Sequence, residues 1–193
     1  MKLYYSPGAC SLASHIALIE SGRDFEAIRV NLKDHTTETG EDFYGISQRG
    51  YVPVIDTADT GVLTENPAVL TYLADTLGAA PTGAARYKLI EWLSFIGSEI
   101  HGAFGPLFGG AEGAALTAAK AKAEGRFALT AELMGESDWL VGEGPSVADN
   151  YLFVTTLWAE KMGVAVPESI AAFRTRNLQR ESVQKAMAAE GLG

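Results

Sequence analysis

Short apolar runs separated by turn residues fill the first third of the chain, and their spacing predicts a β-α-β unit. Met1–Tyr5 predicts a short buried strand, and Ser11–Ser21 predicts a helix that ends at Gly22. Phe25–Val30 alternates between polar and apolar positions and contains β-branched residues, as a second strand does. Because a helix lies between them, we expect the two strands to be parallel.

The next segment predicts a β-hairpin after an irregular stretch. Asn31–Gly50 is polar and irregular, with one short helix expected around Glu41–Ile46. A strand begins at Pro53, and a turn over residues 57–61 leads to a second short strand at Val62–Thr64.

A helix closes this half of the chain. Asn66 is the predicted N-cap, Pro67 the predicted first helical residue, and Gly78 the C-terminal stop. The order is therefore β-α-β, an irregular segment, and β-β-α.

Helical periodicity dominates the second half, and no strand pattern follows residue 78. Residues 78–85 form a short Ala/Gly/Pro linker, so we predict a first domain over residues 1–77 and a helical domain over residues 86–193. Arg86–Ala103 predicts a helix, and the glycine-rich segment Gly102–Gly113, which contains Pro106, predicts a bend or break. The apolar face of that helix is predicted to hold Leu89, Ile90, Leu93, Ile96 and Ile100.

Further helices are predicted at Ala114–Met134, Glu168–Gln179 and Ser182–Glu190. Ser146 and Asp149 have the spacing of a capping box in front of an apolar run, with Asp in place of the more usual Glu. We assign these two residues a structural role at a helix start.

Composition restricts the possible partners. The chain has 193 residues, 47% of them hydrophobic, and a net charge of −9, and both halves carry more acidic than basic residues. Nucleic acid is therefore not an expected partner, because phosphate-backbone binding needs a basic face. Neither a membrane span of roughly 18 apolar residues nor an N-terminal signal region is evident, so we expect a soluble protein. The histidines, His15, His35 and His101, form no pair at metal-ligand spacing, and no metal is expected.

Cys10 is the single cysteine, and it lies beside the predicted start of the first helix. Unpaired backbone N–H groups and the helix dipole favour a thiolate there, so Cys10 is a candidate nucleophile. The alternative is that Cys10 is a small buried hydrophobe. Since Ala13 occupies the second position of a Cys-x-x-Cys motif, any redox chemistry has to be monothiol. A lone cysteine permits no intrachain disulfide, which suits a reducing cytoplasm.

Two further positions suit a peptide-like ligand. Pro53 either only sets the start of its strand or forms a cis bond with Val52, which would offer its N–H and C=O to an extended peptide. Asn66, or the N–H groups after it, could hold a carboxylate, and Glu65 could hold an ammonium. Together with the thiol, these groups describe a receptor for a γ-glutamyl tripeptide thiol.

Motifs over nearly the whole chain resemble the bacterial beta-class glutathione S-transferases. The N-terminal ones are Tyr-x-Pro-Gly-Ala-Cys-Ser-Leu-Ala-x-His at residues 5–15, Gly-Tyr-Val-Pro at residues 50–53 and Leu-Thr-Glu at residues 63–65. Others lie at residues 90–93, 98–101, 105–108, 146–153 and 189–192. The resemblance implies a thioredoxin-like α/β N-terminal domain, an all-α C-terminal domain, a homodimer, and glutathione as co-substrate.

The resemblance also implies roles for individual residues. Cys10 would face the sulfur of glutathione, in a hydrogen bond or a mixed disulfide, and His101 would act near that sulfur. The glutathione-binding set would be Tyr5, Cys10, His35, Tyr51, Val52, Pro53, Glu65, Asn66 and Glu99, with Glu99 reaching ligand of the partner subunit. The electrophile pocket would include His101, Phe104 and Phe108. His15 is expected to be structural, and His101 could equally be a satisfied core histidine.

Four positions depart from the pattern of that family. His35 and Gly102 stand where lysine is frequent, Tyr51 where glutamine is common, and Asn66 where serine or glycine is common. Fewer positive contacts should weaken binding of a ligand with two carboxylates. His35 could compensate only when protonated, so we expect affinity for glutathione to rise at acidic pH.

Three functions are compatible with the sequence. The first is conjugation of the glutathione thiolate to hydrophobic electrophiles. The second is a glutathione-dependent monothiol disulfide or peroxide reductase, for which Cys10 is indispensable. The third is a non-catalytic carrier of apolar ligands.

Overall fold

The chain folds into two compact units. The computed structural model describes residues 1–192, and Met1–Ala80 together with the segment that begins at Arg180 forms the first unit. Pro81–Gln179 forms the second.

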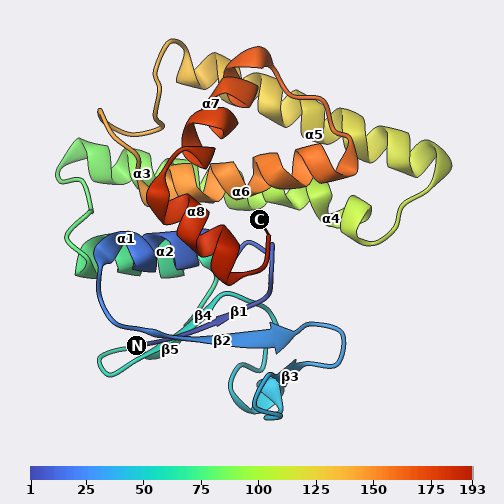
Figure 1. The fold of residues 1–193 in the computed structure, drawn as a ribbon. Helices are drawn as coiled ribbons and strands as arrows, with labels where there is room; N and C mark the ends of the chain where they lie inside the picture. The colour runs from blue at the N-terminus through green and yellow to red at the C-terminus, as the bar shows by residue number, and fades with distance from the viewer. Residues whose placement is uncertain (193) are drawn as a thin grey trace. The chain divides into compact units, whose positions relative to one another are not determined.

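A five-stranded sheet organises the first unit (Figure 1). Its strands lie in the order β3-β2-β1-β4-β5; β1 and β2 are parallel, and the other neighbours are antiparallel. The strands are β1 (Lys2–Tyr5), β2 (Glu26–Asn31), β3 (Thr36–Thr37), β4 (Val54–Thr57) and β5 (Gly61–Thr64). The parallel pair and the hairpin are confirmed. The segment predicted as irregular contains the short strand β3 and a 3-10 helix, η1 (Phe43–Gly45).

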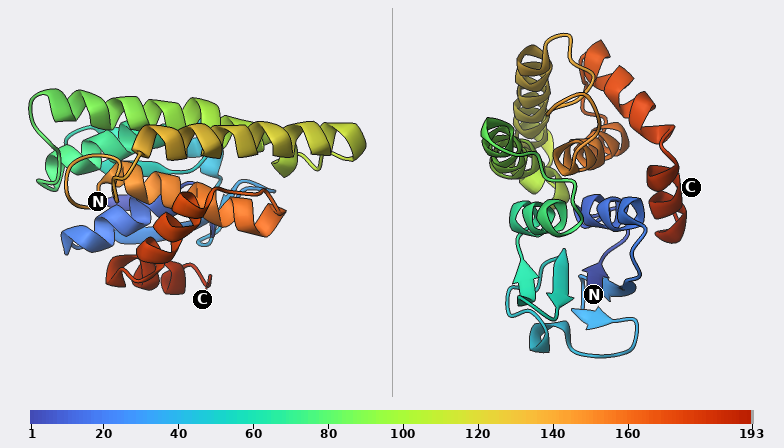
Figure 2. Two further views of the ribbon diagram at one scale, coloured as in Figure 1. Left: turned by 90° about the horizontal axis from the view of Figure 1, so that it is seen from above. Right: turned by 90° about the vertical axis from the view of Figure 1, so that its left-hand side faces the viewer.

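Two helices, α1 (Leu12–Ser21) and α2 (Asn66–Thr76), cover one face of this sheet (Figure 2, right). The α1 helix ends at Gly22, whose φ of 63° is the left-handed conformation that glycine adopts without steric cost. The opposite face of the sheet carries a second apolar cluster, closed by Phe43 of η1. That cluster contains Tyr4, Ile28, Val30, Phe43, Val52 and Val54.

The start of α2 corrects the predicted cap. Asn66 is the first residue of the helix and Glu65 occupies the N-cap position, with a positive φ of 70°. The side chain of Asn66 does not cap the helix, because its Oδ1 instead accepts a hydrogen bond from Ser14 Oγ of α1 at 3.3 Å. Pro67 is consequently the second helical residue, where a missing N–H is equally harmless.

The C-terminal helix, α8 (Glu181–Ala189), belongs to the first unit, whereas the predicted boundary assigned it to the helical domain. It packs on α1, with Val183 and Ala186 buried, and Glu20 of α1 pairs with Arg180 and accepts a hydrogen bond from Ser182. Periodicity shows which face of such a helix is apolar, but it does not reveal which surface the face covers.

Helices alone form the second unit. They are α3 (Ala84–Phe95), the π-helical turn η2 (Ile96–His101), α4 (Gly102–Phe108), α5 (Gly113–Met134), α6 (Val147–Met162) and α7 (Glu168–Leu178). Among residues 1–192 every strand lies before Gly78, and no helix there has the length and apolar character needed to cross a membrane. The helical character of this half is confirmed.

The break predicted within Gly102–Gly113 is confirmed, and it lies at residues 109–112, between α4 and α5. It begins later than the predicted helix end at Ala103, because α3, η2 and α4 follow one another without a gap and α4 continues through Pro106 to Phe108. Glycine costs a helix about 1 kcal/mol per residue. Full burial of the Phe104 ring, which packs against Phe127 of α5, offsets that cost. Four of the five predicted face residues of this segment are buried, and Ile90 is exposed.

The capping box at the start of α6 is confirmed. The Asp149 carboxylate is fully buried and accepts hydrogen bonds from the backbone N–H of Ser146 (2.8 Å) and from its hydroxyl (2.6 Å). Its second oxygen accepts from the backbone N–H of Leu140 at 2.9 Å. One carboxylate therefore fixes both the helix start and the loop before it.

Candidate functional site

Cys10 lies in the turn that joins β1 to α1. Hydrogen bonds from Ala9 N–H to the Ser6 carbonyl and from Ala13 N–H to the Cys10 carbonyl shape this turn. The cysteine side chain is only 9% exposed, and its Sγ–H donates to the Val52 carbonyl at 3.3 Å. The thiol is thus held against the segment that precedes β4.

The expected thiolate at Cys10 is wrong for this structure. Burial raises the pKa of the Cys10 thiol to about 12, and the backbone N–H groups of Cys10 and Ser11 oppose that rise only in part. The nearby Glu65 carboxylate raises the pKa further. The helix end therefore acts as the sequence suggested, but desolvation outweighs it, and Cys10 is a thiol at neutral pH.

The Val52–Pro53 peptide bond is cis, the second of the two possibilities that the sequence left open. Val52 is buried, and its carbonyl is already engaged by Cys10. Tyr51, just before it, is 72% exposed. The segment 51–53 therefore presents an exposed ring next to a buried backbone group.

Glu65 and Asn66 differ sharply in their surroundings. The Glu65 carboxylate is largely exposed and pairs with Arg49. Asn66 is 5% exposed, and its buried Nδ2 has no hydrogen-bond partner within residues 1–192. Because an unsatisfied buried donor costs roughly 1–3 kcal/mol, this amide is poised to donate to an incoming acceptor.

His35 is held in an unusual conformation. Its φ is 55°, its ring lies on Tyr44 with 4.4 Å between centroids, and its Nδ1 is buried without a hydrogen-bond partner among the described residues. Gly50 permits this packing, since a Cβ there would lie 2.7 Å from the Tyr44 ring. The imidazole is therefore fixed by its neighbours.

In the second unit, His101 ends the η2 turn inside an aromatic cluster. Its Nδ1 lies 2.7 Å from the hydroxyl of Tyr151, and its ring meets Trp158 edge-on at 4.7 Å. Phe108 lies perpendicular to the imidazole at 6.2 Å. Burial lowers the pKa of His101, so the neutral imidazole is favoured.

The other predicted residues of this unit have structural partners. Phe104 is fully buried between Phe108, Phe127 and Trp158 and lines no open surface, which corrects its assignment to a pocket wall. Phe108 is 49% exposed. Glu99 pairs with Arg126 of α5 at 3.0 Å.

Comparison with known proteins decides the family. The family model "Glutathione S-transferase, N-terminal domain" matches residues 8–76, and "Glutathione S-transferase, C-terminal domain" matches residues 92–181. The chain belongs to the glutathione S-transferase family. A curated relative, glutathione S-transferase GstA of Escherichia coli O157:H7, is 40% identical over the full length of both chains.

Solved structures of glutathione S-transferases agree with this fold over the whole chain. A sphingomonad glutathione S-transferase complexed with glutathione is 42% identical, with a TM-score of 0.94 and full coverage of both chains. The beta-class enzyme of Sphingomonas chungbukensis is 40% identical, with a TM-score of 0.92 and full coverage of both. The resemblance to the bacterial beta class, and with it the thioredoxin-like plus all-α architecture, is confirmed.

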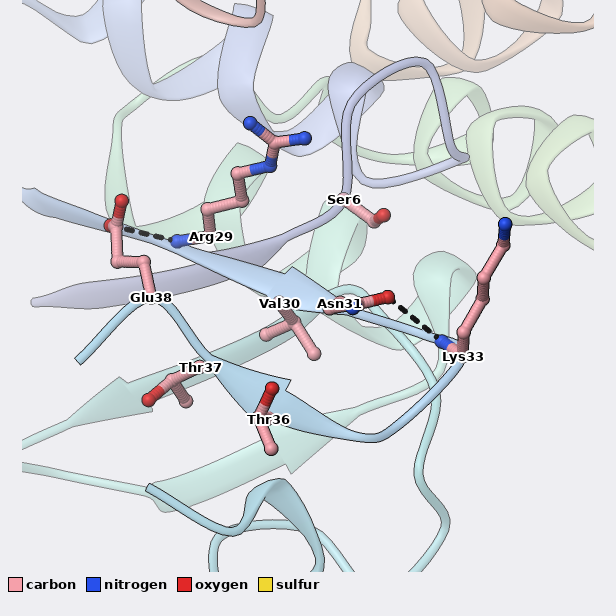
Figure 3. A pocket seen from close by; sticks show the side chains of 8 residues that line it. All are labelled: Ser6, Arg29, Val30, Asn31, Lys33, Thr36, Thr37 and Glu38. Atoms are coloured by element: carbon pink, nitrogen blue, oxygen red, sulfur yellow. Dashed lines mark hydrogen bonds between the residues drawn. The ribbon is translucent and has the colours of Figure 1, made fainter. Parts of the chain in front are cut away.

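None of the predicted glutathione-binding residues is among the residues that line the hollow drawn in Figure 3. It has a volume of ≈ 630 Å³. Its lining consists of Ser6, Arg29, Val30, Asn31, Lys33, Thr36, Thr37 and Glu38. Arg29 and Glu38 are linked there by a hydrogen bond from the Arg29 backbone N–H to the Glu38 carboxylate at 3.0 Å. Within residues 1–192, no group of three or more His, Cys, Asp or Glu side chains is arranged to hold a metal ion.

Sequence reasoning missed one hydrogen-bond partner near the candidate residues of each unit. Glu190 of the C-terminal segment accepts from the Gly8 N–H and from His15, and Tyr151 bonds to His101. Neither position has a local signal, because each partner is more than 40 residues away in the chain. A buried histidine at both sites was the available clue, since such a ring needs a hydrogen-bond partner.

Proposed function

We propose that this protein conjugates the thiol of glutathione to small hydrophobic electrophiles. The observation that carries the proposal is the unpartnered, buried Nδ2 of Asn66. It lies at the start of α2, which Ser14 ties to α1, the helix that begins just after Cys10. A thiol, a peptide segment and an amide donor thus belong to one unit.

The γ-glutamyl end of glutathione matches the groups at the start of α2. Its carboxylate would accept from Asn66 Nδ2 and from the free N–H groups of the first helical turn. Its amine would pair with the Glu65 carboxylate, which then exchanges Arg49 for the ligand. The cysteinyl part of glutathione would contact Val52, Tyr51 and Pro53. Its glycine carboxylate would bind near His35.

The protonated state of Cys10 favours conjugation over disulfide reduction. A thiol can donate its Sγ–H to the sulfur of glutathione and so stabilise the glutathione thiolate, which attacks the electrophile. Disulfide reduction instead needs Cys10 itself as a thiolate, and burial opposes that form. The reductase remains the second candidate, and the carrier the third.

The electrophile would contact His101 and the half-exposed ring of Phe108. Together with Trp158 they form an apolar surface with one polar group, as sites for small hydrophobic ligands do. Tyr5, buried and packed on His15, would support the turn below the sulfur rather than touch it.

Assembly and location follow the same proposal. We expect a homodimer, as the family resemblance implies. We also expect a cytoplasmic location, because a single free cysteine suits a reducing compartment. For Glu99 to reach glutathione of a partner subunit, its carboxylate would have to be shared with Arg126.

Calorimetric titration with glutathione, together with a conjugation assay on 1-chloro-2,4-dinitrobenzene, tests the proposal. Asn66→Ala should weaken binding about tenfold, the range of one hydrogen bond to a charged group, whereas Asn31→Ala, an exposed control, should leave it unchanged. Equal loss in both variants, or no conjugation by the wild type, contradicts the proposal.

Intact mass after incubation with oxidised glutathione separates the first two candidates. We expect little adduct on the wild type at neutral pH, and retained conjugation in Cys10→Ala. A rapid single adduct on Cys10 would support the reductase instead.

A further inference from the structure

We infer that Tyr151 is a positioning residue that fixes the tautomer of His101, so that Nε2–H is offered to the leaving group of the electrophile. This inference rests on the proposed conjugation of glutathione. It concerns residues of the second unit alone.

The contact is short and rigidly supported. Tyr151 lies in α6, is 1% exposed, and places its hydroxyl 2.7 Å from His101 Nδ1. His101 is the last residue of the π-helical turn η2, and such turns within helices are frequent at functional sites. The pair therefore joins two helices whose backbones are fixed by the packed core.

The chemistry of the two groups sets the direction of this hydrogen bond. A neutral imidazole has one donor nitrogen and one acceptor nitrogen, and the bond made by one determines the role of the other. A phenol O–H is a stronger donor than its oxygen is an acceptor, so Tyr151 donates and Nδ1 accepts. The proton of the ring then resides on Nε2.

The surrounding rings hold this arrangement in place. Trp158 meets the imidazole edge-on at 4.7 Å, and Phe108 lies perpendicular to it at 6.2 Å. A ring flip would move Nδ1 away from the Tyr151 hydroxyl and break this hydrogen bond. In addition, these apolar rings lower the local dielectric, which strengthens a hydrogen bond donated by the Nε2–H of His101.

This donor suits a displacement reaction. The sulfur of glutathione forms a bond to the electrophilic carbon, the bond to the leaving group breaks, and the electron pair departs with the leaving group. Negative charge develops on that atom, and Nε2–H donates a hydrogen bond to it without transferring the proton. His101 is thus a hydrogen-bond donor through Nε2–H, and the hydrogen bond from Tyr151 to Nδ1 keeps the proton on Nε2.

Nitrogen-15 NMR of the histidine side chains tests the tautomer directly. The His101 signals are assigned by their loss in His101→Gln, and His15 and His35 serve as internal references. We expect a protonated Nε2 and an unprotonated Nδ1 in the wild type and in Tyr87→Phe, an exposed control, but averaged signals in Tyr151→Phe. A protonated Nδ1 in the wild type overturns the inference.

Steady-state kinetics test whether Tyr151 positions His101 for the conjugation reaction. Tyr151→Phe removes only a hydroxyl, and should lower kcat about twofold to tenfold, the worth of one neutral hydrogen bond, with the KM for glutathione unchanged. The same substitution in a His101→Gln background should have no further effect. An equal loss in both backgrounds, or a loss that follows the thermal midpoint, overturns the positioning role.

Different results would contradict the proposed conjugation of glutathione and the proposed role of Tyr151. If the wild type conjugates no electrophile, the proposed function fails and the role toward a leaving group fails with it, whatever the tautomer. If conjugation is present and Tyr151→Phe changes neither the spectrum nor kcat, only the inference about Tyr151 fails.

Discussion

The carboxylate of Glu190 lies 2.9 Å from Nδ1 of His15, and both side chains are almost completely buried. The other carboxylate oxygen accepts the backbone N–H of Gly8 at 2.9 Å. The end of the chain is therefore bonded to the turn that carries Cys10 and to the helix that follows it. The ring of Tyr5 lies against His15 and completes this support.

This relationship predicts that Glu190→Gln destabilises the first unit. An amide has one acceptor oxygen and an NH2 donor, so the variant cannot accept from both the Gly8 N–H and His15 as the carboxylate does. The free energy of unfolding should fall by about 1–3 kcal/mol, measured by urea denaturation. Glu181→Gln, in the exposed first turn of α8, the helix that ends just before Glu190, is the control and should stay within about 0.5 kcal/mol of the wild type. Equal stability of the two variants would show that the buried pair contributes nothing.

The pKa of Cys10 predicts its reactivity. With a pKa of about 12, the thiol is ionised to a very small extent at neutral pH, and that extent rises tenfold for each unit of pH. Alkylation by iodoacetamide should accordingly accelerate steadily from about pH 7 to 10 in the folded protein, without a plateau. In urea the same cysteine should approach a plateau near its ordinary pKa of about 8.5. A plateau near pH 7 in the folded protein would restore the thiolate that the sequence suggested.

The capping box at Asp149 predicts a purely structural loss. Asp149→Ala leaves the buried N–H groups of Ser146 and Leu140 without their acceptor, so the loss should exceed that of an ordinary cap and reach about 2 kcal/mol. Thermal unfolding gives this loss, and glutathione affinity should not change. A variant of normal stability, or one with selectively weakened binding, would contradict the structural assignment.

The sequence predicted elements well where local chemistry decides them. The strand, turn and helix around Cys10, the hairpin, and the Ser146–Asp149 cap all follow from nearby residues, and the structure has them. The start of α2 differed by one residue because Ser14, 52 positions away, engages Asn66. Such contacts depend on tertiary packing and leave no mark in the local pattern.

The candidate site was less predictable than the fold for the same reason. Residue types indicated Cys10 and His101, but the ionisation of Cys10 depends on how much water its surroundings exclude, and periodicity does not give that quantity. The expected wall residue Phe104 is buried instead, since the apolar composition of α4 cannot distinguish a ring in the core from a ring in a pocket. Family resemblance supplied the roles, and the packing revised the one given to Phe104.

His35 gives the last prediction. A positive charge at position 35 would lie beside the expected position of the glycine carboxylate of glutathione and should favour its binding. His35→Lys supplies that charge permanently and should strengthen binding at neutral pH. It should also lower stability by about 1 kcal/mol, because lysine is less tolerant of a φ of 55° and lacks the ring that rests on Tyr44. Calorimetric titration with glutathione and thermal unfolding check the two effects, with His35→Gln as the uncharged control. An unchanged affinity in the lysine variant at neutral pH would remove His35 from the glutathione site.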